Sequence, residues 1–585
     1  MFLRSVKAAN GRHEYPRLVE SYREGDKIRQ RIVMHIGRKD LLAPHLDALV
    51  RVLQADQPAP AWVSAEQVAA PQAWTWGPVL VARHLFDSLS LGPILDGASQ
   101  SPRHGQPLCE RIFPLVANRL TRPGSEHALA AWLEDFYVVT AGGRRWMPQW
   151  KTSRRVKVSF QQLRLWYETL DDLVAEKVRI ETAIWQELRD LFSLEPELVF
   201  YDITSTYFEG QGPAELGRFG CSRDGKPRGT LWVRQVLVGV VLMDGWPIAH
   251  HVFAGNRLDK TTVGEVVEDL RRRFGLQRVV FVGDRGMVTL KNVEWLGQIE
   301  QGYLVGLQRR HRKDIPHYIE QARARNEWQE CPAGITASEK TIVPRTRVRE
   351  VPGKEPGVRV FVVHSEEREQ YERSRRELSM ERARKDLEAL RPRVEKGELK
   401  EAHKIGAAAA RVLARNHGHR YFDWELRQGR LHYFEHPVNF PREQAGEGKY
   451  VIQTEETDLS PVEAVTAYKQ LNEVERGFAH LKGLLEVRPV YHHQDDRVRA
   501  HVFVAALAFL LDRALEKRLR SAKSSLSSPA AWRALETVRC VEIEVGNRRK
   551  LCVTRGSRQA AEVLKILRLS ELDPPEPPPG EETVM

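Results

Sequence analysis

The chain has 585 residues, of which 42% are hydrophobic and 29% are charged, and this composition predicts a globular protein of about three or four domains. Its formal net charge of +12 favours a polyanionic partner such as nucleic acid, because Lys and Arg neutralise phosphates. Five scattered cysteines without a CxxC pair exclude a disulfide framework and a zinc ribbon. No segment resembles an export signal or a membrane span, so we expect a cytoplasmic protein that has no membrane partner.

Two regions are expected before residue 196. In the first, apolar and polar residues alternate around a turn at Glu24-Gly25-Asp26, which predicts a small β region. The second is mostly helical and contains RRWMPQWKTSRRVKVSF, whose mixture of cations and tryptophans suits phosphate contacts and base stacking. A solvated linker whose tryptophans cap a core explains this segment equally well. The candidate DNA-binding cations are Arg144, Arg145, Lys151, Arg154, Arg155 and Lys157.

An α/β core is predicted from residue 196 onward. ELVFYDITSTYFEG predicts one strand, and TLWVRQVLVGVVLMDGWPIAHHVFAGN predicts two more around a turn at Asp244-Gly245. A helix, a buried strand, a second helix and a last strand follow. The order βββαβαβ, with mixed parallel and antiparallel pairing, is that of an RNase H-like core with a mixed five-stranded sheet and flanking helices.

A long basic segment of strands and helices is predicted to interrupt this core as an insertion. The core then resumes at the strand KYVIQT and the helix after it. The chain ends in DPPEPPPGEETVM, whose prolines and acidic residues predict disorder. The expected regions are 1–72 (small β region), 73–195 (helical, DNA-binding), 196–308 (first part of the core), 309–448 (insertion domain), 449–525 (second part of the core) and 526–585 (C-terminal region).

Three acidic residues fall on elements of the predicted core. Asp202 lies within the first core strand, where burying an unpaired carboxylate is costly. Asp284 directly follows the strand VVFVG, which neighbours the first strand in an RNase H-like sheet. Glu475 lies on the helix AYKQLNEVERGFAHLKGLLEVRP, at the edge of its apolar stripe. Each acid alone has an ordinary structural explanation, but together they favour a metal site.

Three carboxylates are hard oxygen ligands of the kind that Mg²⁺ prefers. One or two ions, with two expected, can activate a water or a 3′-hydroxyl and stabilise the leaving oxygen at phosphorus; Mn²⁺ is an acceptable substitute. The helix that carries Glu475 also carries Tyr468, Leu471 and Lys482. At about 100° per residue, all four project within an arc of about 60° on one helix face.

These segments carry a resemblance to a known family. FYDITSTYFEG, FVGDRGM and the Y-x2-L-x3-E-x6-K helix resemble the three acidic motifs of bacterial insertion-sequence DDE transposases. The resemblance is specifically to the IS-four superfamily and, within it, the group named after insertion sequence sixteen-thirty-four. It implies that Asp202, Asp284 and Glu475 bind the catalytic metal and that Tyr468 and Lys482 contact phosphates of the transposon end.

The resemblance leaves two DNA contacts open. Leu471 stands where the family usually has an Arg, which removes one expected phosphate contact. Arg285, beside Asp284, can hold DNA or pair with a carboxylate.

A second candidate for metal binding lies at residues 492–496. His492, His493, Asp495 and Asp496 have side chains that can bind metal, but a surface loop between helices is the favoured interpretation of that segment.

The implied function is cut-and-paste DNA transposition. The protein would bind the terminal inverted repeats of its element, cleave the DNA ends through a hairpin intermediate and join the 3′-OH groups to a target. It would act on double-stranded DNA as a homodimer in a synaptic complex, in the bacterial cytoplasm and associated with the nucleoid. Two alternatives remain: an RNase H-like metal nuclease without strand transfer, and a non-catalytic DNA-binding repressor or relic.

Overall fold

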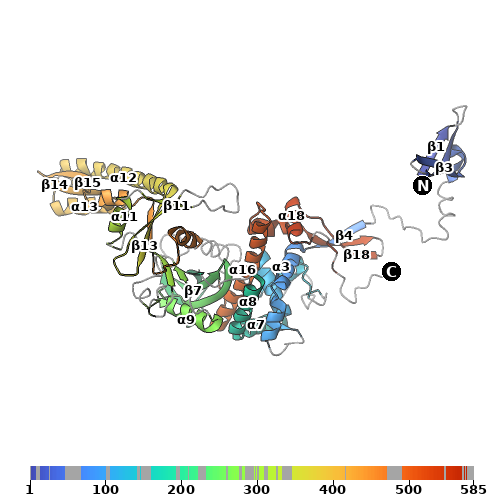
Figure 1. Cartoon of the computed structure of the whole chain (residues 1–585), viewed down its shortest axis with the longest axis horizontal. Helices are drawn as coiled ribbons and strands as arrows, with labels where there is room; N and C mark the ends of the chain where they lie inside the picture. The colour runs from blue at the N-terminus through green and yellow to red at the C-terminus, as the bar shows by residue number, and fades with distance from the viewer. Residues whose placement is uncertain are drawn as a thin grey trace. The chain divides into compact units, whose positions relative to one another are not determined.

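Figure 1 shows a computed structural model of the chain. It divides into two compact units, one of Met1–Pro71, Ile543–Arg549 and Val584–Met585, and one of Gln72–Glu542 and Lys550–Thr583. The structure describes residues 2–7, 13–24, 27–45, 68–99, 106–140, 145–146, 160–192, 198–208, 210–221, 232–258, 261–275, 280–283, 295–296, 298, 302–307, 312, 314–324, 327–331, 346–415, 417–470, 490–545, 548–569, 572–573 and 575.

The first unit contains an antiparallel three-stranded sheet. Its strands are β1 (Phe2–Lys7), β2 (Glu14–Glu24) and β3 (Lys27–His35), in the order β1-β2-β3. Both β2 and β3 contain aromatic and β-branched residues, such as Tyr15 and Val19 in β2 and Ile28 and Ile32 in β3, which favour strands. A short helix, α1 (Lys39–Leu42), follows, and then a 3-10 turn at Ala43–His45.

In the second unit, a group of helices gathers around the long helix α16 (Asp495–Ser521). The middle of α16 is apolar on nearly all sides, so it is buried, and it packs against α3, α5, α7 and the strand β8 (Figure 1). The helices of this group are α3 (Gly77–Ser88), α4 (Leu91–Ala98), α5 (Leu108–Thr121), α6 (Leu129–Asp135), α7 (Phe160–Ala175) and α8 (Lys177–Phe192).

A mixed sheet lies beside these helices. Its central strands run in the order β8-β7-β5-β9-β10; β7 pairs antiparallel with β5 and β8, whereas β9 pairs parallel with β5 and β10. The predicted turn at Asp244-Gly245 joins β7 to β8 with φ of 46° and 72°, as a two-residue hairpin requires. The elements are β5 (Leu198–Tyr207), β7 (Trp232–Met243), β8 (Trp246–Ala254), α9 (Val263–Phe274), β9 (Val280–Gly283) and β10 (Gly302–Leu307).

Within the described residues the sheet has ten strands, so the predicted number of five is wrong. The reason is that β10 is not an edge: β16 pairs antiparallel with it, and β13, β12 and β11 continue the ladder from within the segment expected to be an insertion. On the other side, β6 pairs with β7. The additional strands are β6 (Arg218–Cys221), β11 (Gln329–Cys331), β12 (Thr346–Pro352), β13 (Arg359–Ser365) and β16 (Lys449–Thr454).

The remaining elements form a second, separate apolar cluster and the C-terminal part of the described chain. Helices α12 and α13 and the hairpin β14-β15 enclose an apolar cluster of their own. Strands β4, β17 and β18 form a separate three-stranded sheet. None of the described helices combines the length and the apolar character needed to cross a membrane. The bounds are α11 (Ile315–Arg323), α12 (Glu366–Glu395), α13 (Ala402–Arg415), β14 (Phe422–Arg427), β15 (Arg430–Glu435), α14 (Asn439–Ala445), α17 (Ser528–Leu535), α18 (Arg558–Ile566), β4 (Val68–Thr75), β17 (Arg539–Val545) and β18 (Arg548–Val553).

Candidate active site

Two adjacent strands carry the first two predicted metal ligands. Asp202 lies in β5 and pairs with Val240 of β7. The parallel neighbour β9 is in register with β5 at Phe200 and Val282 and ends at Gly283. Asp284 and Arg285 follow in the sequence and lie outside the described residues. Phe200 and Val282 are partners in this register, and Asp202 and Asp284 each follow one of them by two residues in the sequence.

Opposite faces of β5 meet different helices. Tyr201 donates its hydroxyl to Thr262 Oγ1 at 3.0 Å, just before α9 begins. Thr204, three residues further along β5, lines a small cavity together with Val502 and Ala505 of α16. Because side chains alternate along a strand, positions 200, 202 and 204 share the face that α16 covers. The candidate active site therefore belongs to the α16 face of the sheet.

A helix at residues 461–470 brings the third motif toward this face. Tyr468 packs against the ring of Tyr450 in β16 with centroids 5.8 Å apart, and Lys469 Nζ donates to Thr346 Oγ1 of β12 at 2.8 Å. The next residue, Gln470, lines a cavity with Phe200 of β5. Leu471, Glu475 and Lys482 lie outside the described residues. The helix is thus anchored on β12 and β16 and reaches β5 five residues before Glu475 in the sequence.

The predicted basic segment is described at two residues. The Arg145 guanidinium lies 4.2 Å from the ring centroid of Trp74 and 4.9 Å from that of Tyr137. Trp146 is buried, with its ring 5.3 Å from that of Trp166. Trp146 therefore caps a core, as the alternative interpretation expects, and DNA binding by Arg145 stays a prediction. The cations outside the described residues are Arg144, Lys151, Arg154, Arg155 and Lys157.

A buried ionic network holds α8 against β8 and α9. The Glu181 carboxylate accepts hydrogen bonds from Lys177 Nζ at 2.6 Å, from His250 Nδ1 at 2.8 Å and from Arg273 Nη1 at 2.5 Å. Arg273 also pairs with Asp269 of α9. Burial raises the pKa of Glu181, but Lys177, His250 and Arg273 more than offset this and bring it well below its usual value. Burial, together with the Lys177 charge, lowers the pKa of His250 to about 4. This network was not predicted, because His250 and Arg273 are distant from Glu181 in the sequence.

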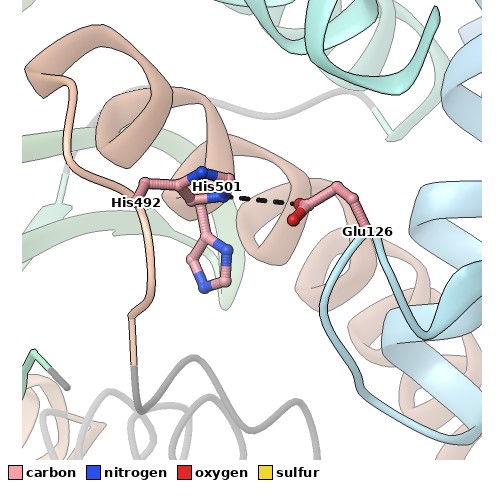
Figure 2. A group of neighbouring side chains, drawn as sticks. All are labelled: Glu126, His492 and His501. Atoms are coloured by element: carbon pink, nitrogen blue, oxygen red, sulfur yellow. Dashed lines mark ion pairs between the residues drawn. The ribbon is translucent and has the colours of Figure 1, made fainter. Parts of the chain in front are cut away.

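A second buried group corrects the prediction for His492. That residue was expected in a surface loop, yet it is buried, and Figure 2 shows its ring beside Glu126 from the turn between α5 and α6. His492 Nε2 lies 3.4 Å from Glu126 Oε1, and His501 of α16 completes the group. The ring of His492 is buried because it packs against Tyr167 and His501, whereas Tyr491 and Gln494 in the same loop are exposed. His493 and Asp496 are exposed, whereas Asp495 Oδ1 accepts from the backbone N of Leu216 at 2.8 Å.

The Glu126, His492 and His501 group has the donor atoms of a metal site but is better explained as a hydrogen-bond network. Ligand atoms of the three residues lie within 4.8 Å of one another. However, Arg119 Nη2 donates to His501 Nδ1 at 3.4 Å. This occupies one ring nitrogen, places the ring proton on the other, and adds a cation beside the group. A bound cation would have to displace this contact.

Comparisons with known proteins agree with the motifs. A family model described as "Transposase DDE domain" matches residues 203–511, more than half of the chain. A second, described as "IS1634 family transposase, N-terminal domain", matches residues 3–64. The chain therefore belongs to the DDE transposases and, within them, to the IS1634 family of the IS4 superfamily. It is a transposase that acts on DNA, and the DDE domain implies dependence on a divalent metal.

One solved structure shows a distant likeness. It is described as "Cryo-EM structure of piggyBac transposase synaptic complex with hairpin DNA (SNHP)" and shares 8% sequence identity, with 79% of each chain covered and a TM-score of 0.32. A likeness of this degree carries no argument about the present chain. The comparison with curated proteins gives no match. The predicted family, enzyme class and transposase function are confirmed by the family models.

Proposed function

We propose that this transposase moves its element by a cut-and-paste reaction on an RNase H-like core. The observation that carries the proposal is the strand order β8-β7-β5-β9-β10, with Asp202 on the central strand β5 and Asp284 directly after its parallel neighbour β9. When two adjacent parallel strands carry acidic residues at matching positions of the register, the two carboxylates come close together at one edge of the sheet. The helix at 461–470, which reaches β5 at Gln470, leads into the third acid.

The metal would be held by Asp202, Asp284 and Glu475. The donor set fits Mg²⁺, because all three ligands are carboxylates, and Mn²⁺ accepts the same ligands. One or two bound ions would supply charge stabilisation and an activated water or 3′-hydroxyl at the scissile phosphate. The chain itself would hold two of these carboxylates in place: Asp202 by strand pairing in the middle of the sheet, and Glu475 by the anchored helix that precedes it.

DNA binding is proposed for cations and a tyrosine around this face. Tyr468, Lys482 and Arg285 would contact the transposon end, and the basic segment of residues 144–157 would bind phosphates within the helical DNA-binding region, 73–195. The terminal inverted repeats would be the specific ligand. Because two ends must be joined together, the active form would be a homodimer in a synaptic complex. We propose that it works in the bacterial cytoplasm at the nucleoid.

A cleavage assay tests the proposal. The substrate is a labelled duplex that carries the element's end, taken from the DNA that flanks the reading frame, incubated with Mg²⁺ and a target plasmid. Wild type should yield cleaved ends and joined products, whereas Asp202→Asn and Glu475→Gln should yield neither. Glu473→Gln, two residues from Glu475, is the matched control and should retain activity. Unchanged cleavage in Glu475→Gln would exclude the triad, and cleavage without joining would identify a nuclease instead.

A further inference from the structure

A polar cavity of about 150 Å³ lies on the same face of the sheet as position 202. Phe200 of β5 and Leu242 of β7, which pair with each other across the sheet, form its floor. Asp244 and Gly245 of the β7-β8 turn line one side, and Gln470 of the helix at 461–470 lines another. The rest of the wall is basic and consists of Arg513, Lys517 and Arg520 from α16.

The three cations come from one face of α16, because their spacing of four and three residues matches the helical repeat. They differ in exposure: the Arg513 side chain is 3% exposed, whereas those of Lys517 and Arg520 are 29% and 31% exposed. Arg513 is fixed inside the protein, where it donates to the Gly245 carbonyl at 3.0 Å. Lys517 and Arg520 are therefore the cations that a ligand entering from solvent can reach.

The cavity has more positive than negative charge. Lys517 Nζ lies 3.1 Å from Asp244 Oδ2, while Arg513 and Arg520 lie 2.5 Å and 2.6 Å from different oxygens of Glu516. Among the residues that line the cavity, three are cations and one, Asp244, is a carboxylate. The apolar floor strengthens the effect of these charges, because a charge beside low-dielectric groups is screened less than one in water. A mostly basic lining of this kind favours an anion over a cation as the ligand.

We propose that this cavity binds a backbone phosphate of DNA, with Lys517 and Arg520 as its cationic contacts and the Gln470 amide as a neutral donor. The cavity has about five times the volume of roughly 30 Å³ that one water molecule takes up in the liquid, so it admits a phosphate with its ester oxygens but no base pair. This proposal rests on the proposed function, since it places the phosphate beside the strand that carries Asp202.

A purely structural role is the competing explanation. Cations near the end of a helix interact favourably with its dipole, and those at i+3 and i+4 pair with acids such as Glu516. If that is their whole role, removing Lys517 or Arg520 lowers the melting temperature slightly and leaves DNA affinity unchanged. The two explanations therefore differ in a binding measurement that involves no catalysis.

The experiment measures binding of the full chain to a fluorescent duplex carrying the element's end, by anisotropy in EDTA at a series of salt concentrations. Lys517→Gln and Arg520→Gln should each weaken binding severalfold at low salt. Loss of one phosphate contact should reduce the slope of log K against log salt by about 0.9. Arg499→Gln is the matched control, because Arg499 lies on the same helix, is 35% exposed and pairs with Asp496 at 3.1 Å. It should bind as wild type does.

Two further controls separate loss of the phosphate contact from misfolding of the variant. Lys517→Arg retains the charge and should restore most of the affinity, and melting temperatures verify that each variant is folded. Wild-type affinity and slope in both glutamine variants would overturn the proposal, as would an equal loss in Arg499→Gln. Because the binding reaction contains no metal, its result is independent of the cleavage assay. If Asp202→Asn still cleaved, the metal triad would fail while the phosphate site could still be supported.

Discussion

Glu181 offers a direct test of how the helical region is fixed to the sheet. Its buried carboxylate is shared by Lys177, His250 and Arg273, whose side chains are 20%, 3% and 4% exposed. Replacing Glu181 by Gln keeps the size of the side chain but removes its charge. Lys177 then loses its ion pair with residue 181, while Arg273 keeps Asp269. The variant therefore leaves a cation in a site from which water is largely excluded.

The expected cost follows from this geometry. Removing one member of a buried ion pair typically costs about 3–5 kcal/mol, because the remaining charge stays desolvated. Since Asp269 still neutralises Arg273 and Lys177 is partly exposed, we expect the lower end, about 3 kcal/mol. At about 1.4 kcal/mol for each factor of ten, this corresponds to roughly a hundredfold increase in the population of locally opened molecules.

Hydrogen exchange is the suitable assay, because a chain of this size with two compact units is not expected to unfold in one step. Amides of α8 and β8 should exchange roughly a hundredfold faster in Glu181→Gln, in the regime where exchange reports the opening equilibrium. Arg272→Ala is the control: Arg272 is 79% exposed and lies 3.3 Å from Asp269, so its loss should change exchange little. An effect in Glu181→Gln no larger than that of the control would refute the reasoning.

Two further predictions concern packing and pH. A Cβ at Gly239 would lie 2.8 Å from side-chain atoms of Tyr201, the residue before Asp202, so Gly239→Ala should destabilise the protein by about 1–3 kcal/mol and slow cleavage. Gly264→Ala is the control: its Cβ would have no atom nearer than 3.9 Å, so the melting temperature should be nearly unchanged. Equal effects of the two substitutions would contradict this prediction. Burial raises the pKa of Glu126, but the hydrogen bond and charge of His492 more than offset this and bring it to about 2, below the usual 4.5. The stability that the ionised Glu126 carboxylate contributes is therefore fully present above about pH 4.5 and is lost as the pH falls toward 2. Glu126→Gln should flatten the plot of melting temperature against pH between these two values. An unchanged plot would refute the ion pair.

Local patterns in the sequence predict several parts of the fold. The dipeptide Asp244-Gly245 has the conformational freedom that a tight hairpin requires, and the hairpin is present. The β-branched runs around Asp202 and before Asp284 predict strands, and these strands are parallel neighbours in the sheet. Trp246, the first residue after this turn, is buried and stacks on Phe192 of α8 with ring centroids 4.7 Å apart.

Local sequence patterns do not predict which strands and side chains pair when they are distant in the sequence. Nothing local to β16 indicates that it joins β10 to β13, so the sheet was expected to end at five strands. The burial of His492 depends on Glu126 and His501, which come from a turn and a helix elsewhere in the chain. Two of the partners of Glu181, His250 and Arg273, are likewise distant from it in the sequence. Sequence motifs thus identify the family and the acids, whereas the packing that holds them depends on contacts that no single segment reveals.

The central claim is that Asp202 binds the catalytic metal, and exchange of its ligand atom tests this most directly. Asp202→Cys replaces a hard oxygen ligand by sulfur, which Mg²⁺ accepts poorly and Mn²⁺ accepts better. The end-cleavage assay is run with each metal on wild type and variant. We expect the variant to be inactive with Mg²⁺ and to recover part of its cleavage with Mn²⁺. Wild-type cleavage by Asp202→Cys in Mg²⁺ would contradict the assignment of Asp202 as a metal ligand.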